Sequence, residues 1–260
     1  MVNIKRAIFI TVRSDSSRLP NKAYKEILGT PVIEMIIKRA KLSKSANIVI
    51  VCTTERQIDD KIQEIAKKCG VQCFRGSLND KLERWNGAVN AFGVDIIATF
   101  DGDDLLCSPE LIDLAFEQIN RENLDFIKSP DGLACGAFTY CIRAKALEKV
   151  CQIKNTQDTE MMWTYFEDTG LFKVGELQVD DKIYYNNNVR LTLDYQEDFD
   201  FYENLFTYFK NFQNDIPLKT ALEYLNEHPE IIAINSAKQQ EWKQNQIKKT
   251  KLVLREELKS

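Results

Sequence analysis

The stretch Arg13–Lys22 has the sequence R-S-D-S-S-R-L-P-N-K and directly follows the apolar run A-I-F-I-T-V at residues 7–12. A continuous run of β-branched and aromatic residues between polar turns predicts a buried strand of a parallel sheet. The basic loop then lies at the carboxyl end of this strand, the edge where open α/β sheets bind ligands. Its three cations and three serine hydroxyls suit a polyanion such as a triphosphate. The alternative interpretation is a solvated charged loop.

Strand and helix patterns alternate along most of the chain after this loop. Further strands are predicted at residues 48–52, 71–74, 94–100 and 125–128, in a strand that passes into a helix at 137–147, and at 189–194. Apolar residues at helical spacing follow Pro31, run from Ile58 to Ala66, and recur from Phe199 to Phe209. This alternation indicates βαβ units and therefore an α/β fold whose mostly parallel sheet is flanked by helices.

The composition shifts beyond Asn214. Leu218, Leu222 and Leu225 predict a short helix there. Residues 239–260 are polar and charged and lack Gly and Pro, which suits an exposed C-terminal helix or a frayed tail. We therefore divide the chain into a main domain at residues 1–214 and a C-terminal helical extension at residues 215–260.

The whole-chain composition disfavours several classes of protein. A hydrophobic fraction of 44% and a charged fraction of 28% are those of an ordinary soluble globular protein. A net charge of −4 and a pI of about 5.3 argue against a nucleic-acid-binding surface. No apolar run approaches the roughly 20 residues that span a bilayer, and the seven cysteines lack paired C-x-x-C spacing, as expected for reduced thiols. We expect a cytoplasmic protein with no nucleic-acid or membrane partner.

A cluster of carboxylates, D-G-D-D at residues 101–104, follows the predicted strand at 94–100. Such crowding costs electrostatic energy unless a cation relieves it, so the cluster predicts a Mg²⁺ site at the strand end. The alternative is an acidic turn that caps the helix beginning at Pro109. Asp194, at the end of the last predicted strand, offers a second carboxylate; alternatively it caps the helical pattern that follows.

Five motifs in this order resemble the sugar cytidylyltransferases, and the resemblance covers most of the chain. The motifs are Arg13–Lys22 with I-L-G-T-P-V at residues 27–32, F-R-G-S at 74–77 with Asp80, Leu82 and Arg84, Gly102-Asp103 before Pro109-Glu110, P-D-G at 130–132, and R-L-T-L-D at 190–194. The family includes the 3-deoxy-manno-octulosonate and acylneuraminate cytidylyltransferases and the spore coat polysaccharide biosynthesis branch, which this sequence resembles most.

The resemblance implies a Rossmann-like nucleotidyltransferase (GT-A-like) fold and a CTP-dependent cytidylyltransferase. Such an enzyme transfers CMP to a sugar acid, sugar phosphate or related small acceptor and releases pyrophosphate, here for surface polysaccharide biosynthesis. The resemblance also implies Mg²⁺ bound by Asp103 and Asp194, and a homodimer. An apolar segment suits a subunit contact or the mouth of the active site. Its side chains are those of Met161, Met162, Trp163, Tyr165 and Phe166.

The candidate residues have different expected roles. Arg13, Lys22 and Asp103 are the candidate catalytic residues. Phosphate binding is expected from the loop cations, and base recognition from Thr53 and Arg75 at two further strand ends. The complete set of candidate nucleotide-binding residues is Arg13, Ser14, Ser16, Ser17, Arg18, Lys22, Thr53, Arg75 and Arg84.

Three residues depart from the family pattern. Asp15 stands where relatives carry a small residue, so it either binds metal, selects a different donor or marks an inactive nucleotide-binding module. Asn21 replaces Gly, and its tolerance of a left-handed conformation lets the turn survive. Asp104 replaces an uncharged residue and leaves open which of the three clustered carboxylates holds the metal. Residues 156–164 fit the relatives poorly, so the acceptor is not assigned.

Two other functions remain open at this stage. A glycosyltransferase of similar fold also binds a nucleotide and a metal through acidic residues after a parallel strand, although a nucleoside diphosphate donor has less need of the Arg13–Lys22 loop. The inactive module is the non-enzymatic alternative. His228 is the only histidine, which disfavours Ser-His-Asp hydrolysis, Cys-His proteolysis and multi-histidine zinc sites.

Overall fold

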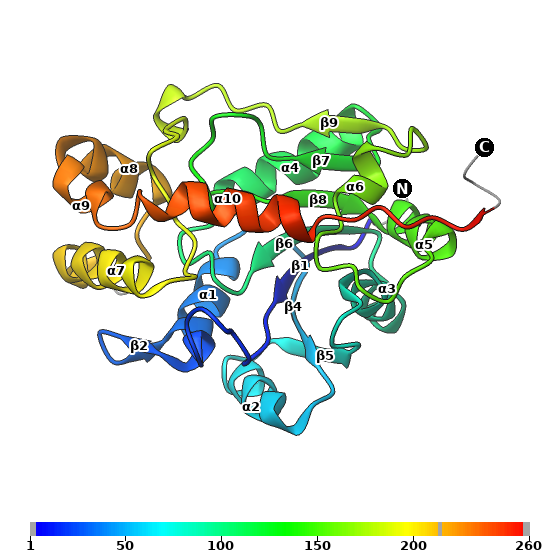
Figure 1. The fold of residues 1–260 in the computed structure, drawn as a ribbon, viewed down its shortest axis with the longest axis horizontal. Coiled ribbons are helices and arrows are strands. Elements are labelled where there is room, and N and C mark those ends of the chain that lie inside the picture. Colours follow the sequence, from blue (N-terminus) through cyan, green and yellow to red (C-terminus); the bar gives the residue numbers. More distant parts are fainter. Residues whose placement is uncertain (1–3, 213–214, 257–260) are drawn as a thin grey trace.

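The computed structural model describes residues 4–212 and 215–256, so the predicted boundary at residue 214 and the tail at 257–260 lie outside the described residues. Its centre is a seven-stranded sheet with the order β5-β4-β1-β6-β8-β7-β9 (Figure 1). The strands are β1 (Arg6–Thr11), β4 (Ile48–Thr54), β5 (Gln72–Gly76), β6 (Ile96–Asp101), β7 (Phe126–Lys128), β8 (Tyr140–Arg143) and β9 (Val174–Glu176). A separate hairpin consists of β2 (Glu26–Ile27) and β3 (Thr30–Pro31).

Helices cover both faces of the sheet. They are α1 (Val32–Ala40), α2 (Asp60–Lys68), α3 (Lys81–Phe92), α4 (Pro109–Arg121), α5 (Ala144–Ile153), α6 (Thr164–Glu167), α7 (Gln196–Tyr208), α8 (Leu218–Glu227), α9 (Pro229–Ala233) and α10 (Lys238–Lys249). Ile8 and Ile10 of β1 share one apolar core with α1, α2 and α4, whereas Ala7 and Phe9 share the other with α3, α5 and α6. Successive strand side chains point to opposite faces, so a strand that is apolar throughout needs cover on both. The predicted mostly parallel α/β fold is confirmed.

The two candidate segments leave the sheet side by side. β1 pairs in parallel with β6, and Thr11 lies opposite Asp101. The backbone N of Gly102 donates to the carbonyl O of Thr11 at 2.8 Å. A Cβ atom at Gly102 would lie 2.6 Å from the Cβ of Val12, so this close approach requires glycine. The basic loop after β1 and the acidic turn after β6 therefore meet at the carboxyl edge.

β8 runs antiparallel to both β6 and β7, a direction that the sequence pattern did not indicate. Residues 129–139 connect β7 to β8 without a helix. Parallel neighbours need a longer crossover connection, so a loop of this kind returns the chain in the opposite direction. As a result, the 129–139 loop begins and ends at the same edge as the acidic turn after β6.

The predicted strand at residues 189–194 is wrong. This segment is extended but bridges the loop before β8 only once within the described residues, between Cys135 and Arg190. Its neighbours are loops, so no ladder of backbone hydrogen bonds forms. The apolar alternation that suggested a strand arises because Leu191 and Leu193 are buried in the core.

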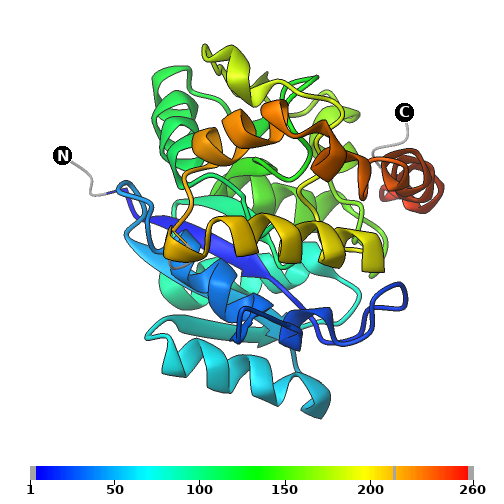
Figure 2. The ribbon, with the colours of Figure 1, turned by 90° about the vertical axis from the view of Figure 1, so that its left-hand side faces the viewer.

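The C-terminal helices differ in how they pack. The predicted short helix is confirmed as α8, and its Leu218, Leu222 and Leu225 belong to the same apolar core as Phe201 and Phe206 of α7. α10 instead crosses the carboxyl edge of the sheet in front of β6 and β8 (Figure 1). Figure 2 shows it nearly end-on, on the outside of the body. The division of the chain at residue 214 stays a prediction.

The apolar segment at residues 161–166, expected to form a subunit contact or the mouth of the active site, packs mostly in the core of the same chain. Met162, Tyr165 and Phe166 are at most 1% exposed. The ring of Phe166 stacks on that of Phe126 of β7, with centroids 4.6 Å apart. Trp163 is half-buried at the cavity described below. This segment therefore offers little apolar surface to a second copy, and the homodimer stays a prediction.

Two further expectations concern the whole chain. All seven cysteines, which lie within the described ranges, are free thiols. Cys52, Cys107 and Cys141 are buried, and the other four are half-buried. Among the helices of the described part of the chain, none has both the length and the apolar character required to cross a membrane.

Candidate active site

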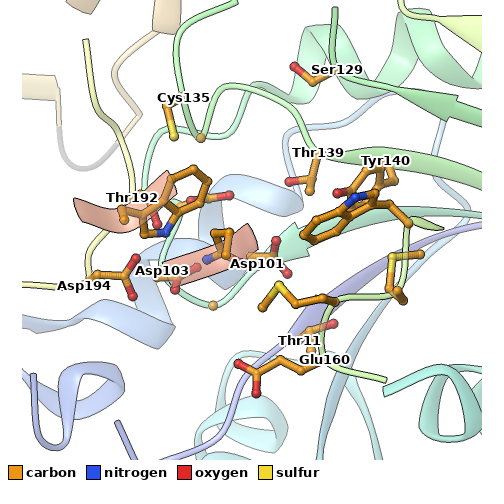
Figure 3. A pocket seen from close by; sticks show the side chains of 18 of the residues that line it. Thr11, Asp101, Asp103, Ser129, Cys135, Thr139, Tyr140, Glu160, Thr192 and Asp194 are labelled. Atoms are coloured by element: carbon orange, nitrogen blue, oxygen red, sulfur yellow. The ribbon is translucent and has the colours of Figure 1, made fainter. Parts of the chain in front are cut away.

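A cavity of about 960 Å³ lies at the carboxyl edge of the sheet, and its walls include the loop after β1 and α10 (Figure 3). Small-molecule sites usually measure roughly 300–1,000 Å³, so this volume suits a nucleotide together with a second substrate. The acidic turn after β6, the 129–139 loop and the segment that ends at Asp194 complete most of the wall. The predicted site residues that line it are Arg13, Ser16, Ser17, Arg18, Lys22, Arg84, Asp103 and Asp194.

Three predicted nucleotide-binding residues lie elsewhere. Ser14 belongs to the loop after β1 but its side chain is buried, and Thr53 is fully buried within β4. Arg75 donates from Nε to the carbonyl O of Thr54 at 2.9 Å and forms an ion pair with Asp60 at 2.6 Å. Its side chain therefore holds the turn after β4. None of these three side chains lines the cavity in the described structure.

Asp59, which the sequence analysis did not single out, holds the loop after β1 in place. Its fully buried carboxylate accepts hydrogen bonds from Ser14 N at 2.8 Å, Ser14 Oγ at 2.6 Å, the hydroxyl of Thr54, and Arg56 Nη2 at 3.2 Å. Burial alone would raise the pKa of Asp59, but the bonds from Ser14 and Thr54 outweigh it and lower this pKa. In the sequence, Asp59 looks like any acidic residue near a helix start.

We expect Asp59→Ala to weaken nucleotide binding through loss of loop position. The substitution frees Ser14 from its anchor, so the neighbouring phosphate-binding side chains lose their fixed geometry and nucleotide KM rises. Lost buried hydrogen bonds should also reduce the free energy of unfolding by about 1–3 kcal/mol. Asp60→Ala is the matched control, since the Asp60 side chain is 49% exposed and pairs with Arg75 instead. An equal rise in nucleotide KM in both variants would contradict the anchoring role.

Asp15 does not place an uncompensated negative charge in the loop. Arg56 donates from Nη1 and Nη2 to its two carboxylate oxygens at 2.6 and 2.7 Å. This bonding from Arg56 holds the pKa of Asp15 below its usual value. Because the Asp15–Arg56 pair is neutral overall, Asp15 does not repel an incoming phosphate. Asp15 therefore no longer argues for an inactive nucleotide-binding module. Asn21 has a φ of 55°, the left-handed conformation expected for this turn.

Lys22 lies between the two candidate metal ligands, which Figure 3 shows side by side. Its Nζ donates to Asp103 Oδ2 at 2.6 Å and to Asp194 Oδ1 at 3.0 Å. Burial alone would lower the pKa of Lys22, but the two carboxylates raise it above its usual value. Burial likewise would raise the pKa of Asp194, yet Lys22 and Arg18, which donates from Nη2 at 2.5 Å, hold it well below the usual value. The basic loop and the two carboxylates thus form one ion-pair cluster.

Neither of the two acidic segments serves as a helix cap. At α4 the cap is Ser108, whose Oγ accepts from Leu111 N at 3.2 Å. At the start of α7, Asp198 Oδ2 accepts from the backbone N of Asp194 at 2.8 Å and of Tyr195 at 2.9 Å. The capping alternatives are therefore wrong, and the side chain of Asp194 binds Lys22 at the cavity wall instead.

Crowding of carboxylates raises pKa values in the turn after β6. Burial raises the pKa of Asp103, and the carboxylates of Asp194 and Asp101 add to the effect against the opposing Lys22. Burial also raises the pKa of Asp104 well above its usual value, with Asp103 and Asp101 adding to it. Asp104 is only 5% exposed, whereas Asp101 and Asp103 are half-buried, so Asp104 is the least accessible of the three carboxyl groups to a ligand.

The donor atoms fit Mg²⁺ in combination with substrate phosphates. No ready-made metal cage of three or more His, Cys, Asp or Glu occurs within residues 4–212 and 215–256. Mg²⁺ is commonly held by only one or two carboxylates together with phosphate oxygens. Asp103 and Asp194 already share the ammonium of Lys22, which shows that this pair of carboxylates takes a cation between them.

The charges of the cavity wall also favour an added cation. Eight cationic side chains line it, those of Arg13, Arg18, Lys22, Lys81, Arg84, Lys128, Lys243 and Lys249. Eight acidic side chains line it as well, those of Asp15, Asp101, Asp103, Asp104, Asp131, Glu160, Glu167 and Asp194. The two sets nearly cancel. Even without the contributions of Asp15, which Arg56 neutralises, and of the buried Asp104, a bound triphosphate would leave net negative charge that a divalent cation offsets.

The sequence analysis missed the contribution of α10. Gln239, Trp242, Lys243 and Gln246 of this helix line the cavity. Trp242 and Ile247 are the only apolar side chains of α10, so no apolar stripe distinguishes it from a solvated helix. The link between α10 and the site is the motif residue Arg190, whose Nη1 donates to Gln239 Oε1 at 3.1 Å.

Sequence similarity to known proteins extends over nearly the whole chain. The family model described as Cytidylyltransferase matches residues 7–248. An uncharacterized protein of Methanocaldococcus jannaschii is 33% identical over 232 residues, which cover 87% of this chain and 93% of that protein. The spore coat polysaccharide biosynthesis protein SpsF of Bacillus subtilis is 23% identical over 231 residues, which cover 85% of this chain and 94% of SpsF.

Solved structures agree with this assignment. A cytidylyltransferase from Leptospira borgpetersenii serovar Hardjo-bovis has a TM-score of 0.80 at 30% identity, over 88% of this chain and 97% of that one. A CMP:2-keto-3-deoxy-manno-octonic acid synthetase complexed with CTP has a TM-score of 0.60 at 15% identity, over 78% of this chain and 99% of that one, a likeness of fold alone. Because the family model spans nearly the entire chain and the site geometry accompanies it, the chain belongs to the cytidylyltransferase family and is a nucleotidyltransferase.

Proposed function

We propose that this protein uses CTP to transfer CMP to a sugar acid, sugar phosphate or related small acceptor, with release of pyrophosphate, in polysaccharide biosynthesis. The observation that carries the proposal is the cluster in which Lys22 joins the basic loop after β1 to Asp103 and Asp194 at the cavity. The names of SpsF and of the synthetase complexed with CTP support a sugar-derived acceptor and a cytidine donor.

The reaction demands positioning and charge neutralisation. An acceptor oxygen attacks the α-phosphorus of CTP, the bond from that phosphorus to the bridging oxygen breaks, and pyrophosphate leaves with this oxygen while the acceptor hydroxyl loses its proton. Arg13, Arg18 and Lys22 would hold the phosphates and stabilise the charge on the leaving pyrophosphate. In the structure their charges are balanced by carboxylates, for example Glu160, which pairs with Arg13 Nη2 at 3.1 Å. Phosphate oxygens would replace these partners.

Asp103, with Asp194, is proposed to hold Mg²⁺ beside the phosphates. When bound, the ion supplies Lewis-acid stabilisation of the developing negative charge. The chain's own residues then have separate tasks. The loop after β1 orients the triphosphate, while the cavity walls at the 129–139 loop and α10 exclude water and leave room for the acceptor.

A thermal-shift panel with CTP, ATP, GTP and UTP, each with Mg²⁺, tests the donor. We expect CTP to raise the melting temperature most, because a ligand at about 100 times its Kd adds roughly 2.7 kcal/mol to the free energy of unfolding. Lys22→Ala should reduce the shift for all four nucleotides, since a phosphate contact carries no base information. The exposed Lys44 offers a control variant, Lys44→Ala, that should leave every shift unchanged.

Pyrophosphate release with a panel of sugar acids and sugar phosphates then tests the acceptor. Equal shifts from all four nucleotides would leave nucleotidyl transfer standing but remove the cytidylyl assignment. No shift from any nucleotide, and no pyrophosphate from any acceptor, would instead favour a module without activity.

A further inference from the structure

α10 turns a mostly polar face toward the cavity. The residues of α10 that line the cavity wall are Gln239, Trp242, Lys243, Gln246, Ile247 and Lys249. The first five recur at intervals of three or four residues, which places them on the same side of a helix. None of the residues of α10, all of which the structure describes, is buried. A helix normally faces the body of a protein with apolar side chains. A polar face on a substrate-sized cavity is therefore suited to ligand binding.

The position of α10 is set at its two ends. At its start, Arg190 donates to Gln239 Oε1 at 3.1 Å, and its guanidinium carbon lies 5.4 Å from the centre of the Trp242 ring. Beyond its end, the backbone N of Arg255 donates to the carbonyl O of Ile153, the last residue of α5, at 3.0 Å. The helix therefore crosses the carboxyl edge of the sheet between two anchored points (Figure 1), and this position brings its inner face to the cavity wall.

Lys243 differs from the other cations of the cavity wall. Ion pairs hold Arg13, Arg18, Lys22, Lys81 and Lys128. Arg84 donates from Nη1 to the carbonyl O of Ser77 at 2.7 Å. Burial alone would raise the pKa of Glu160, but Arg13 and then Lys249 lower it, so Lys249 lies near an acidic group although it forms no ion pair within the described residues. The side chain of Lys243, an exposed residue, makes no hydrogen bond or ion pair with any residue in the described ranges.

We propose that Lys243, with Trp242 beside it, binds an anionic group of a substrate, a phosphate or a carboxylate, from the α10 side of the cavity. An ammonium group with no acidic partner gains a charge-assisted hydrogen bond when the anion arrives. The flat Trp242 side chain offers a packing surface for the ring that carries the anion. This inference deepens the proposed function and rests on it for the two possible sources of the anion, the triphosphate of the nucleotide and the acidic group of the acceptor.

The test compares Lys243→Ala and Lys243→Arg with Lys248→Ala. Lys248 lies on the same helix but is not part of the cavity wall, which makes it a matched control. Calorimetry measures the binding of tripolyphosphate with Mg²⁺ and of a panel of sugar acids and sugar phosphates, and kinetics then give KM for each substrate. If the anion belongs to the nucleotide, Lys243→Ala should weaken tripolyphosphate binding and raise nucleotide KM about tenfold or more. If the anion belongs to the acceptor, the variant should show the same loss for the sugar acids and sugar phosphates alone.

The remaining variants complete the design. Lys243→Arg keeps the charge and should restore most of the binding, whereas Lys248→Ala should leave all constants unchanged. Equal binding of every probe by Lys243→Ala and Lys248→Ala would overturn the proposal, as would wild-type protein that binds none of these anions. If tripolyphosphate binding depends on Lys243 but no nucleotide releases pyrophosphate, the proposed function fails and the anion site stands.

Discussion

Asp103→Ala is expected to reduce kcat by at least about a hundredfold while the protein remains folded. The substitution removes the carboxylate that pairs with Lys22 at 2.6 Å and that is proposed to hold Mg²⁺. Loss of a metal ligand removes several kcal/mol of transition-state stabilisation. The side chain lies at the cavity with 23% of its surface exposed, so its removal opens no void in the core. Steady-state pyrophosphate release and a melting curve on the same sample measure the two effects.

A matched control separates loss of the carboxylate from general damage. Asp168 is exposed and lies outside the cavity wall, so Asp168→Ala should keep full turnover. Asp103→Asn retains the shape of the side chain without its charge and should be nearly as impaired as the alanine variant. Turnover of Asp103→Ala within about tenfold of wild type would contradict the proposed metal role.

Arg190→Ala is expected to cause the largest loss of stability. The guanidinium is fully buried and donates from Nε to Asp198 Oδ1 at 2.8 Å and from Nη2 to Asp194 Oδ2 at 3.2 Å. Without it, Asp198 keeps a buried charge whose remaining contacts among the described residues are Asn235 and two backbone N–H groups. Removal of one partner of a buried ion pair costs about 3–5 kcal/mol in the free energy of unfolding. The melting temperature should therefore fall by roughly 6–20 °C.

An exposed ion pair provides the comparison. Lys219 and Asp181 form a pair at 2.8 Å in which both side chains are more than 40% exposed, and Lys219→Ala should change the unfolding midpoint only slightly because water and salt screen such pairs. Arg190→Lys should recover little of the loss, since an ammonium cannot reproduce the bidentate contact with Asp198. Equal denaturation midpoints for Arg190→Ala and Lys219→Ala would show that the buried network contributes little.

The strands that could be predicted are those with continuous apolar runs. β1, β4 and β6 are buried on both faces, and a strand buried on both faces consists of consecutive apolar residues that the sequence shows directly. Their parallel order follows from the helical segments between them. The segment at 189–194 alternates apolar and polar residues without being a strand. Such alternation shows which side chains are buried, but it does not show whether a neighbouring strand pairs with the backbone.

The site residues that could be predicted are those that lie at the ends of predicted strands. Parallel strands bring their carboxyl ends to one edge, so Arg13, Lys22 and Asp103 meet although they come from separate segments. The same reasoning placed Thr53 and Arg75 at that edge, where they do lie. It did not determine their side-chain directions, and the Arg75 side chain binds the carbonyl O of Thr54 instead of facing the cavity.

The sequence by itself determined the α/β architecture, the position of the basic loop and the acidic turn at one sheet edge, and the membership of a nucleotidyltransferase family, because local periodicity and motif order record them. Only the tertiary structure decided which partner each charge takes. Lys22 is bound between Asp103 and Asp194, Asp59 anchors Ser14, and the contacts join residues 45 to 172 positions apart in the chain. The same holds for α10, whose polar sequence carries no burial signal and whose place over the cavity depends on the packing of distant segments around Arg190.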